Sequence, residues 1–145
     1  MTGSGVVVDR RVRARPSAVY AYLTTSDLWV RWQGTSAWLD AVPGGAFEMH
    51  VMNGAVAQGR FVELVRDTRV VFTWGWVGSP TLPPGSSTVE IDLIPDGEET
   101  IVRLRHHGLP PEDVPAHRLG WHHYLPRLAT ASEGADPGPD PGPSP

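Results

Sequence analysis

The chain has 145 residues, of which 40% are hydrophobic and 19% are charged, and this size and composition fit one globular domain. The formal net charge of -4 gives no electrostatic reason to expect nucleic acid or an anionic membrane surface as a partner. Because the sequence contains no cysteine, it excludes a disulfide framework, a thiol nucleophile and a thiolate metal site.

No stretch of the sequence is apolar enough to cross a membrane. The longest aliphatic runs, such as Val6–Val8, are far shorter than the roughly 20 apolar residues that a spanning helix needs. The first residues also lack the apolar segment of a secretory signal peptide. We therefore expect a cytoplasmic protein that does not insert into a membrane.

The beginning of the chain predicts one strand and two short helices. Residues 6–14 are rich in β-branched side chains and favour a strand that ends before Pro16. Because proline is well tolerated in the first turn of a helix, Pro16 favours a helix that covers residues 17–25. A second short helix is expected to begin at Ser26, a good N-cap residue, and to stop at Gly34.

The middle of the chain predicts an antiparallel sheet. Five stretches have strand character, and they cover residues 36–42, 46–52, 56–66, 69–77 and 87–95. A further strand within residues 97–109 follows the Asp96-Gly97 pair, which is a strong signal for a tight hairpin turn. We therefore expect these strands to form an antiparallel meander.

Alternation along these strands separates an apolar face from a charged face. The apolar positions are Phe47, Met49, Val51, Val89, Ile91, Leu93, Val102, Leu104 and His106. The opposite positions are Glu48, Glu90, Asp92, Arg103 and Arg105. Because successive side chains of a strand point to opposite faces, we expect one side of the sheet to be covered and the other to meet solvent.

One long helical pattern, over residues 112–131, is expected to cover the apolar face. Its apolar stripe consists of Val114, Trp121, Leu125 and Leu128. Pro126 removes one backbone hydrogen bond and is expected to kink or weaken the last turns. The Pro- and Gly-rich residues 132–145 have nothing to bury, so we expect a domain over residues 1–131 and a disordered tail.

Five stretches within residues 6–130 carry a family resemblance through their order and spacing. They read VYAYLTTSDLWVRWQG, VPGGAFEMHV, GRFVELVRDTRVVFTWGW, LRHHGLP and HRLGWHHYLPRL. Together they resemble the START/Bet v 1-like (SRPBCC) superfamily, in the branch of the C-terminal domain of the Hsp90 ATPase activator. The resemblance implies an α+β helix-grip fold: a curved antiparallel β-sheet wrapped around a long C-terminal helix, with two short helices after the first strand.

The helix-grip resemblance also implies an internal cavity between the sheet and the C-terminal helix. Phe72, Trp74 and Trp76 occupy alternate positions of one strand, so their rings share one face and would line this cavity. Trp121 would approach it from the helix. Large aromatic walls suit flat apolar ligands.

Three further tryptophans, Trp29, Trp32 and Trp38, would close the mouth of this cavity. The complete set of candidate ligand-binding residues is Trp29, Trp32, Trp38, Met49, Phe61, Phe72, Trp74, Trp76, Leu104, His106, Trp121 and Leu125. The alternative is that these large side chains simply fill the core and leave no space for a ligand.

The six histidines do not predict a metal site. His106 and His107 are adjacent on a strand and point to opposite faces. His122 and His123 diverge by about 100° around a helix. His117 lies five residues before His122, which misses the spacing of four that places two ligands on one helical face. We therefore expect neither a metal nor a cofactor.

His106 is the candidate catalytic residue, because alternation places it on the apolar face with Val102 and Leu104. An imidazole in this position could hydrogen-bond a carbonyl group of a ligand or act as a general acid or base. The alternative is a histidine at a strand end that is bonded to the backbone or to water.

Three functional hypotheses follow. The first is the binding of a small hydrophobic or aromatic metabolite in the internal cavity. The second is an enzyme that resembles the polyketide cyclases and aromatases, in which His106 would move protons. The third, implied by the resemblance to the activator, is a partner domain of an Hsp90-type chaperone. Exposed tryptophans at the cavity mouth would also suit a homodimer interface.

Overall fold

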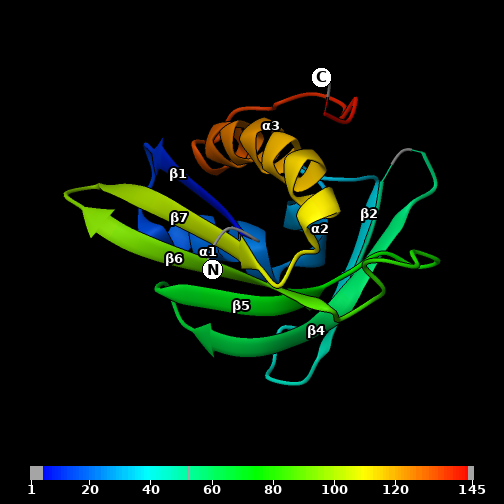
Figure 1. The fold of residues 1–145 in the computed structure, drawn as a ribbon. Coiled ribbons are helices and arrows are strands. Elements are labelled where there is room, and N and C mark those ends of the chain that lie inside the picture. The colour runs from blue at the N-terminus through cyan, green and yellow to red at the C-terminus, as the bar shows by residue number, and fades with distance from the viewer. Residues whose placement is uncertain (1–4, 52, 144–145) are drawn as a thin grey trace.

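The computed structural model describes residues 5–51 and 53–143, and its elements follow the predicted order (Figure 1). They are β1 (Val6–Val12), α1 (Pro16–Thr24), α2 (Ser26–Trp29), β2 (Ser36–Leu39), β3 (Ala46–His50), β4 (Val56–Val65), β5 (Arg69–Trp74), β6 (Ser87–Asp96), β7 (Glu99–His107), the 3-10 turn η1 (Pro111–Asp113) and α3 (Val114–Ser132). Residues 1–4 of the predicted domain, Met52 of the predicted third strand and residues 144–145 of the predicted tail lie outside the described residues.

The strands form one antiparallel sheet in the order β1-β7-β6-β5-β4-β3-β2. The predicted hairpin turn is confirmed, since Asp96 pairs with Glu99 and Gly97 has a left-handed φ of 64°. Figure 1 shows the sheet curving around α3. The protein therefore has the helix-grip α+β fold that the order of its elements predicts.

A bulge in β4 decides which side chains of this strand face inward. The pairing of β4 with β5 shifts between Phe61 and Glu63. Phe61 lies in the core, and after the bulge Leu64 packs against the core while Glu63 pairs with Arg69. Strict alternation from Phe61 would turn the Glu63 carboxylate inward. The extra residue of the bulge therefore keeps this charge outside.

The second short helix begins at Ser26, as predicted, but its end and its N-cap differ from the prediction. α2 ends at Trp29, five residues before Gly34, which has a left-handed φ of 78°. Ser26 is not the N-cap, because Thr25 occupies that position. The Ser26 hydroxyl instead accepts the backbone N–H of Leu39 at 3.0 Å. Ser26 therefore joins α2 to β2 rather than capping the helix.

α3 continues for 19 residues to Ser132, with Pro126 in its interior. The helix continues past the proline because Leu125 and Leu128 on either side of it are buried against the core. The predicted kink or weakening of its last turns stays a prediction. All four residues of the predicted apolar stripe are buried. Within residues 5–51 and 53–143, neither this helix nor another has the length and hydropathy needed to cross a membrane.

Aromatic rings fill the part of the interior between the sheet and the short helices. Phe47 and Phe72 stack with their ring centroids 4.3 Å apart. Trp29 contacts both rings edge-on, at 5.3 and 5.9 Å, and Trp32 lies 4.5 Å from Trp29. All four side chains are at most 1% exposed. This end of the interior is therefore a packed core without space for a ligand.

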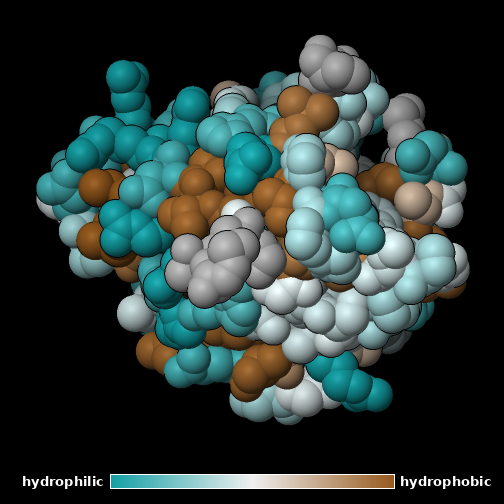
Figure 2. Space-filling view, viewed as in Figure 1, coloured by the Kyte–Doolittle hydropathy of each residue, from teal (hydrophilic) through white to brown (hydrophobic). Residues whose placement is uncertain are grey.

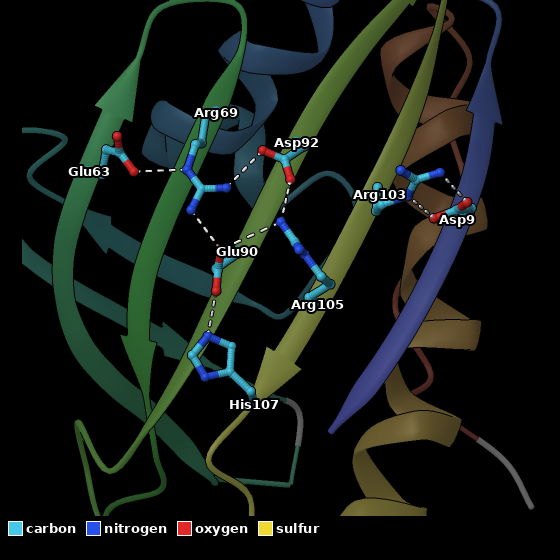
Figure 3. Close-up of polar contacts among 8 residues, drawn as sticks. All are labelled: Asp9, Glu63, Arg69, Glu90, Asp92, Arg103, Arg105 and His107. Carbon is cyan, nitrogen blue, oxygen red and sulfur yellow. Dashed lines mark hydrogen bonds and ion pairs between the residues drawn. The ribbon is translucent and has the colours of Figure 1, made fainter. Parts of the chain in front are cut away.

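The outer face of the sheet carries paired charges, as alternation predicts (Figure 3). Arg69 reaches three carboxylates at 2.6 to 2.8 Å, those of Glu63, Glu90 and Asp92. Its hydrogen bond lowers the pKa of Glu90 below the usual range. The exposed charges thus satisfy one another across neighbouring strands.

Figure 2 shows that apolar residues on the viewed face are scattered among hydrophilic ones.

The residues after α3 turn back along this helix (Figure 1). Arg127 donates hydrogen bonds to the carbonyl groups of residues 137–139 at 2.7 to 3.4 Å, and to that of Trp32 at 2.9 Å. Asp140 is only 8% exposed, and its carboxylate accepts the N–H of Gly34 at 2.9 Å. These contacts favour an ordered segment where composition predicts a tail with nothing to bury. The disorder and the domain boundary stay predictions.

Replacing Phe72 tests the packed core. Phe72→Ala is expected to lower the free energy of unfolding by about 3 to 5 kcal/mol, because it leaves a cavity in the aromatic stack. Val62→Ala is the control on β4, where the valine is 53% exposed, and should change the same quantity by less than about 1 kcal/mol. Urea unfolding measures both variants. Equally small losses would contradict a packed core.

Replacing Arg127 tests the order of the residues after α3. Arg127→Ala should lower the free energy of unfolding by about 1.5 to 3 kcal/mol, since a charged donor to several carbonyls is lost. It should also speed amide hydrogen exchange in residues 137–140, which mass spectrometry of peptides measures. Arg118→Ala, at an exposed position of the same helix, should do neither. Fast exchange in these residues of the wild type would support disorder instead.

Candidate functional site

A cavity of about 540 Å³ lies beside the packed core, between α3 and the sheet. Its walls come from one face of α3, the residues around the end of β5 and the β3–β4 hairpin. Gln33 and residues 140–143 complete the lining. The interior therefore contains both a filled aromatic core and a space of ligand size.

One face of α3 forms the long wall of this cavity. His117, Gly120, Trp121 and Tyr124 line it, and Asp113, the N-cap residue just before the helix, extends the same wall. Their spacing of three and four residues places them on one side of a helix. At a rise of about 1.5 Å per residue, this wall extends for about 16 Å. The cavity can accordingly hold an elongated ligand parallel to the helix.

Trp74 and Trp76 form the facing wall at the end of β5. Their rings meet edge-on with centroids 5.3 Å apart. Gly75 between them is required by the close approach of the following loop, because a Cβ atom there would lie 1.8 Å from the carbonyl oxygen of Pro83. The loop is also held by the hydrogen bond from the backbone N–H of Trp76 to the Leu82 carbonyl at 2.8 Å. Both tryptophans are thus fixed in place.

His117 accepts hydrogen bonds from both of these tryptophans. The Nε1–H groups of Trp74 and Trp76 lie 3.3 and 3.0 Å from His117 Nε2. His117 Nδ1 donates to the backbone carbonyl of Asp113 at 2.8 Å. Two donors at Nε2 require that nitrogen to be unprotonated, which defines the tautomer. Burial lowers the pKa of His117, so the ring is held in its neutral form.

Like His117, His106 accepts a hydrogen bond from an indole N–H, and it lies behind the cavity wall. Its Nδ1 accepts the Nε1–H of Trp121 at 3.0 Å, and its Nε2 donates to the hydroxyl of Ser87 at 2.8 Å. That hydroxyl donates in turn to the carbonyl of Trp74 at 2.8 Å. Complete burial, followed by repulsion from the nearby His117, lowers the pKa of His106 to about 3. Both ring nitrogens are used inside the protein.

These side chains make one imidazole–indole network, which consists of Trp74, Trp76, His106, His117 and Trp121. The centroids of its two imidazole rings are 5.2 Å apart. All three indole N–H groups donate to imidazole nitrogens. In the part of the chain that the structure describes, no group of three or more potential ligand side chains could hold a metal ion. The network is a hydrogen-bonded wall.

A second polar group closes the other end of the cavity. The Asp140 carboxylate accepts the backbone N–H groups of Gly34 and Gly142, at 2.9 and 2.8 Å. His123 Nε2 lies 3.3 Å from it, and the Tyr124 hydroxyl also bonds it. Burial alone would raise the pKa of Asp140, but these hydrogen bonds hold it below the usual range. Burial and the bond to Asp140 raise the pKa of Tyr124.

The structure separates the predicted ligand-binding residues into three groups. Three of them line the cavity, namely Trp74, Trp76 and Trp121. Eight lie buried in the core around it, namely Trp29, Trp32, Met49, Phe61, Phe72, Leu104, His106 and Leu125. Trp38 is 69% exposed on the outer face of β2, so it does not close the mouth of the cavity. Trp29 and Trp32 do not close it either, because they belong to the core.

Most of the lining residues were not among the predicted ones, and they include Gln33, His117, Gly120, Tyr124 and Asp140. His117 had a usable signal, because it precedes Trp121 by four residues and so shares its helical face. Gln33 and Asp140 carry no such signal, since a turn and a distant segment of the chain bring them to the cavity.

Comparison with known proteins agrees with this architecture. Residues 13–133 match the family described as activator of Hsp90 ATPase homolog 1-like protein. The solution structure of an AHSA1-like protein from Rhizobium etli is 43% identical, with a TM-score of 0.70, and the match covers 94% of this chain and 88% of that chain. A search of curated proteins found no match.

Two other solved structures share the fold at lower identity. Protein MLL2253 from Mesorhizobium loti is 20% identical with a TM-score of 0.81, over 91% of this chain and 98% of that chain. The Aha1 dimer from Colwellia psychrerythraea is 20% identical with a TM-score of 0.78, over 92% of this chain and 98% of that chain. The chain therefore belongs to the family of activator of Hsp90 ATPase homolog 1-like proteins, with the helix-grip fold of the SRPBCC superfamily.

Proposed function

We propose that this protein binds a small, uncharged hydrophobic or aromatic metabolite in the cavity between the sheet and α3. The cavity volume of about 540 Å³ lies within the range of about 300 to 1,000 Å³ that is usual for small-molecule sites. Its tryptophan walls offer flat apolar surfaces, and its polar groups are few. Both features are typical of sites that recognise a ligand by shape and burial.

Gly120 is the observation that carries this proposal. It lies in the middle of α3 and lines the cavity. A Cβ atom added at this position would meet no atom within 4 Å. Glycine inside a helix costs about 1 kcal/mol relative to alanine, and no neighbouring atom in the protein requires its small size. The open space beside Gly120 is therefore best explained as room for a ligand.

A negatively charged ligand is disfavoured, because no lysine or arginine is among the described residues that line the cavity. Burial keeps His117 neutral by lowering its pKa. Of the lining carboxylates, Asp140 is bonded to backbone N–H groups, and Asp113 accepts the hydroxyl of Thr81 at 3.0 Å. A negatively charged ligand would lose its hydration without gaining a partner of opposite charge.

The remaining hypotheses receive less support from the geometry. An enzyme that uses His106 for proton transfer needs a free ring nitrogen at the cavity, whereas both nitrogens of His106 are bonded to Trp121 and Ser87. An Hsp90-type chaperone partner, a homodimer like the Aha1 dimer from Colwellia psychrerythraea and a cytoplasmic location all stay predictions. Binding of a metabolite is the function that the cavity supports best.

Substitution of Gly120 tests the proposed function. Methoxynaphthalene serves as an uncharged aromatic probe, and calorimetric titration and the melting temperature report its binding. Gly120→Trp should abolish binding, because the added ring occupies the middle of the cavity. Gly120→Ala, the matched control, should retain binding and raise the free energy of unfolding by about 0.5 to 1 kcal/mol.

The ligand-free melting temperature of each variant separates a blocked cavity from a misfolded protein. We expect both variants to melt at or above the wild-type temperature, since the space beside Gly120 is open. Binding of the probe to Gly120→Trp with wild-type affinity would show that the probe occupies a different site. A wild type that binds no probe would contradict the proposed function.

Lowering the pH should destabilise the protein through its buried imidazoles. His106 has a pKa of about 3 in the folded protein, compared with 6.5 for the free side chain. The unfolded state therefore binds more protons between these values, and stability is lost as the pH falls. Between about pH 6.5 and pH 5 we expect a loss of about 1.5 kcal/mol from His106, and a further loss from His117, whose pKa is also lowered.

Urea unfolding at the two pH values measures this loss. His106→Gln should show a smaller pH dependence than the wild type, because the titrating ring is removed. His122→Gln, at an exposed position of α3, should keep the wild-type dependence. The same free energy of unfolding at both pH values would mean that the imidazoles take up protons as readily in the folded protein as in the unfolded chain.

A further inference from the structure

Residues 136–143 form a strap that returns along α3 and reaches the cavity (Figure 1). After α3 ends at Ser132, the backbone N–H groups of Gly134 and Ala135 donate back to its last turn, and the chain reverses. The strap itself contains neither a helix nor a strand. Its residues 140–143 line the cavity. Part of the cavity wall is therefore a segment that can move without repacking a helix or the sheet.

Hydrogen bonds attach the strap to the rest of the domain. Its residues are exposed or half-buried, except Asp140, which is 8% exposed. Arg127 on α3 donates to the carbonyl groups of residues 137–139. Each such bond contributes little net free energy, because water replaces it when a segment opens. A segment held in this way can open locally while the rest of the protein stays folded.

Asp140 joins the strap to two other elements. Its carboxylate accepts the backbone N–H of Gly34 at 2.9 Å, in the turn between α2 and β2. It is also bonded to His123 and Tyr124 of α3. Within the strap it accepts the N–H of Gly142 at 2.8 Å. Hydrogen bonds to a charged group are about twice as strong as those between neutral groups. One side chain therefore holds the strap against both α3 and the turn before β2.

The composition of the strap suits a segment that closes in one defined shape. Prolines occupy every second position from 137 to 143, and the ring of each proline fixes φ near about −65°. Between them, Gly138 and Gly142 have left-handed φ angles of 78° and 79°, which glycine adopts without steric cost. A segment with few accessible conformations loses little entropy when it becomes ordered. Closing of the strap is therefore less costly than closing of a flexible loop.

We propose that the strap is the lid of the cavity and that Asp140 is its latch. A ligand enters and leaves while the carboxylate is detached from Gly34, and it is enclosed when the carboxylate is attached again. Free and liganded protein use the same latch, so its opening limits the association rate and the dissociation rate of the ligand by the same factor. This inference rests on the proposed function and adds the route by which the ligand exchanges.

Replacing Asp140 tests the lid. Asp140→Ala removes the latch, whereas Asp140→Asn keeps an oxygen that can accept one of the two backbone N–H groups. Asp136→Ala is the matched control, because the Asp136 carboxylate accepts the N–H of Gly138 at 2.8 Å and so bonds within the strap. Stopped-flow fluorescence measures the association and dissociation rates of methoxynaphthalene, since three tryptophans line the cavity. Hydrogen exchange of residues 136–143, followed by mass spectrometry, measures the opening of the strap.

Asp140→Ala should raise both rates by about tenfold, the factor that corresponds to about 1.4 kcal/mol, and should leave the dissociation constant unchanged. Asp140→Asn should raise both rates by a smaller factor, and Asp136→Ala should keep the wild-type rates. Hydrogen exchange in residues 136–143 should be faster in Asp140→Ala than in the wild type. Its ligand-free melting temperature should stay close to that of the wild type, because the hydrophobic core lies outside the strap.

Each contrary result has a distinct meaning. Unchanged rates in Asp140→Ala would overturn the lid and leave the proposed function standing, because the probe still binds. Faster dissociation with a wild-type association rate would overturn it as well, by making Asp140 a contact of the ligand. Unchanged hydrogen exchange in the strap, or failure of both Asp140 variants to fold, would show that Asp140 is not a latch. If methoxynaphthalene does not bind the wild type, the proposed function fails, and the inference that rests on it fails too.

Discussion

The cavity depends on the hydrogen bonds between three indole N–H groups and two neutral imidazoles. Most buried tryptophan N–H groups have an acceptor, and His106 and His117 supply acceptors here because burial keeps them unprotonated. The bonds join the end of β5 to α3 and to β7, through Trp74 and Trp121. These hydrogen bonds fix the positions of the three indole rings that line the cavity.

The two ends of the cavity differ in chemistry. The aromatic end is uncharged and flat, whereas the far end contains the amide of Gln33 and the bonded carboxylate of Asp140. Residues 140–143 line the cavity but lie beyond residues 13–133, which match the family. The family fold thus supplies the helix and sheet walls, and a segment outside the family match completes the site of this chain.

Local patterns predicted most of the fold. Alternation placed Phe72 and Trp74 on the inner face, and the turn at Asp96-Gly97 is where the hairpin forms. Prediction was wrong where one residue type has two possible environments. Trp38 and Trp29 are both tryptophans that were predicted to lie at the cavity mouth. Trp38 is 69% exposed, whereas Trp29 is 0% exposed. Which environment each one meets depends on strands and helices that are distant in sequence.

The sequence by itself determined the elements, their order and the inner face of the sheet, because hydrophobic periodicity and turn residues act over a few neighbouring positions. Only the tertiary structure decided which apolar side chains fill the core and which border a cavity. It also decided that His106 and His117 serve as acceptors, and that Gln33 and Asp140 reach the same space. The physical reason is that the shape of a cavity depends on how the sheet, α3 and residues 140–143 pack against one another. No single segment of the sequence contains that information.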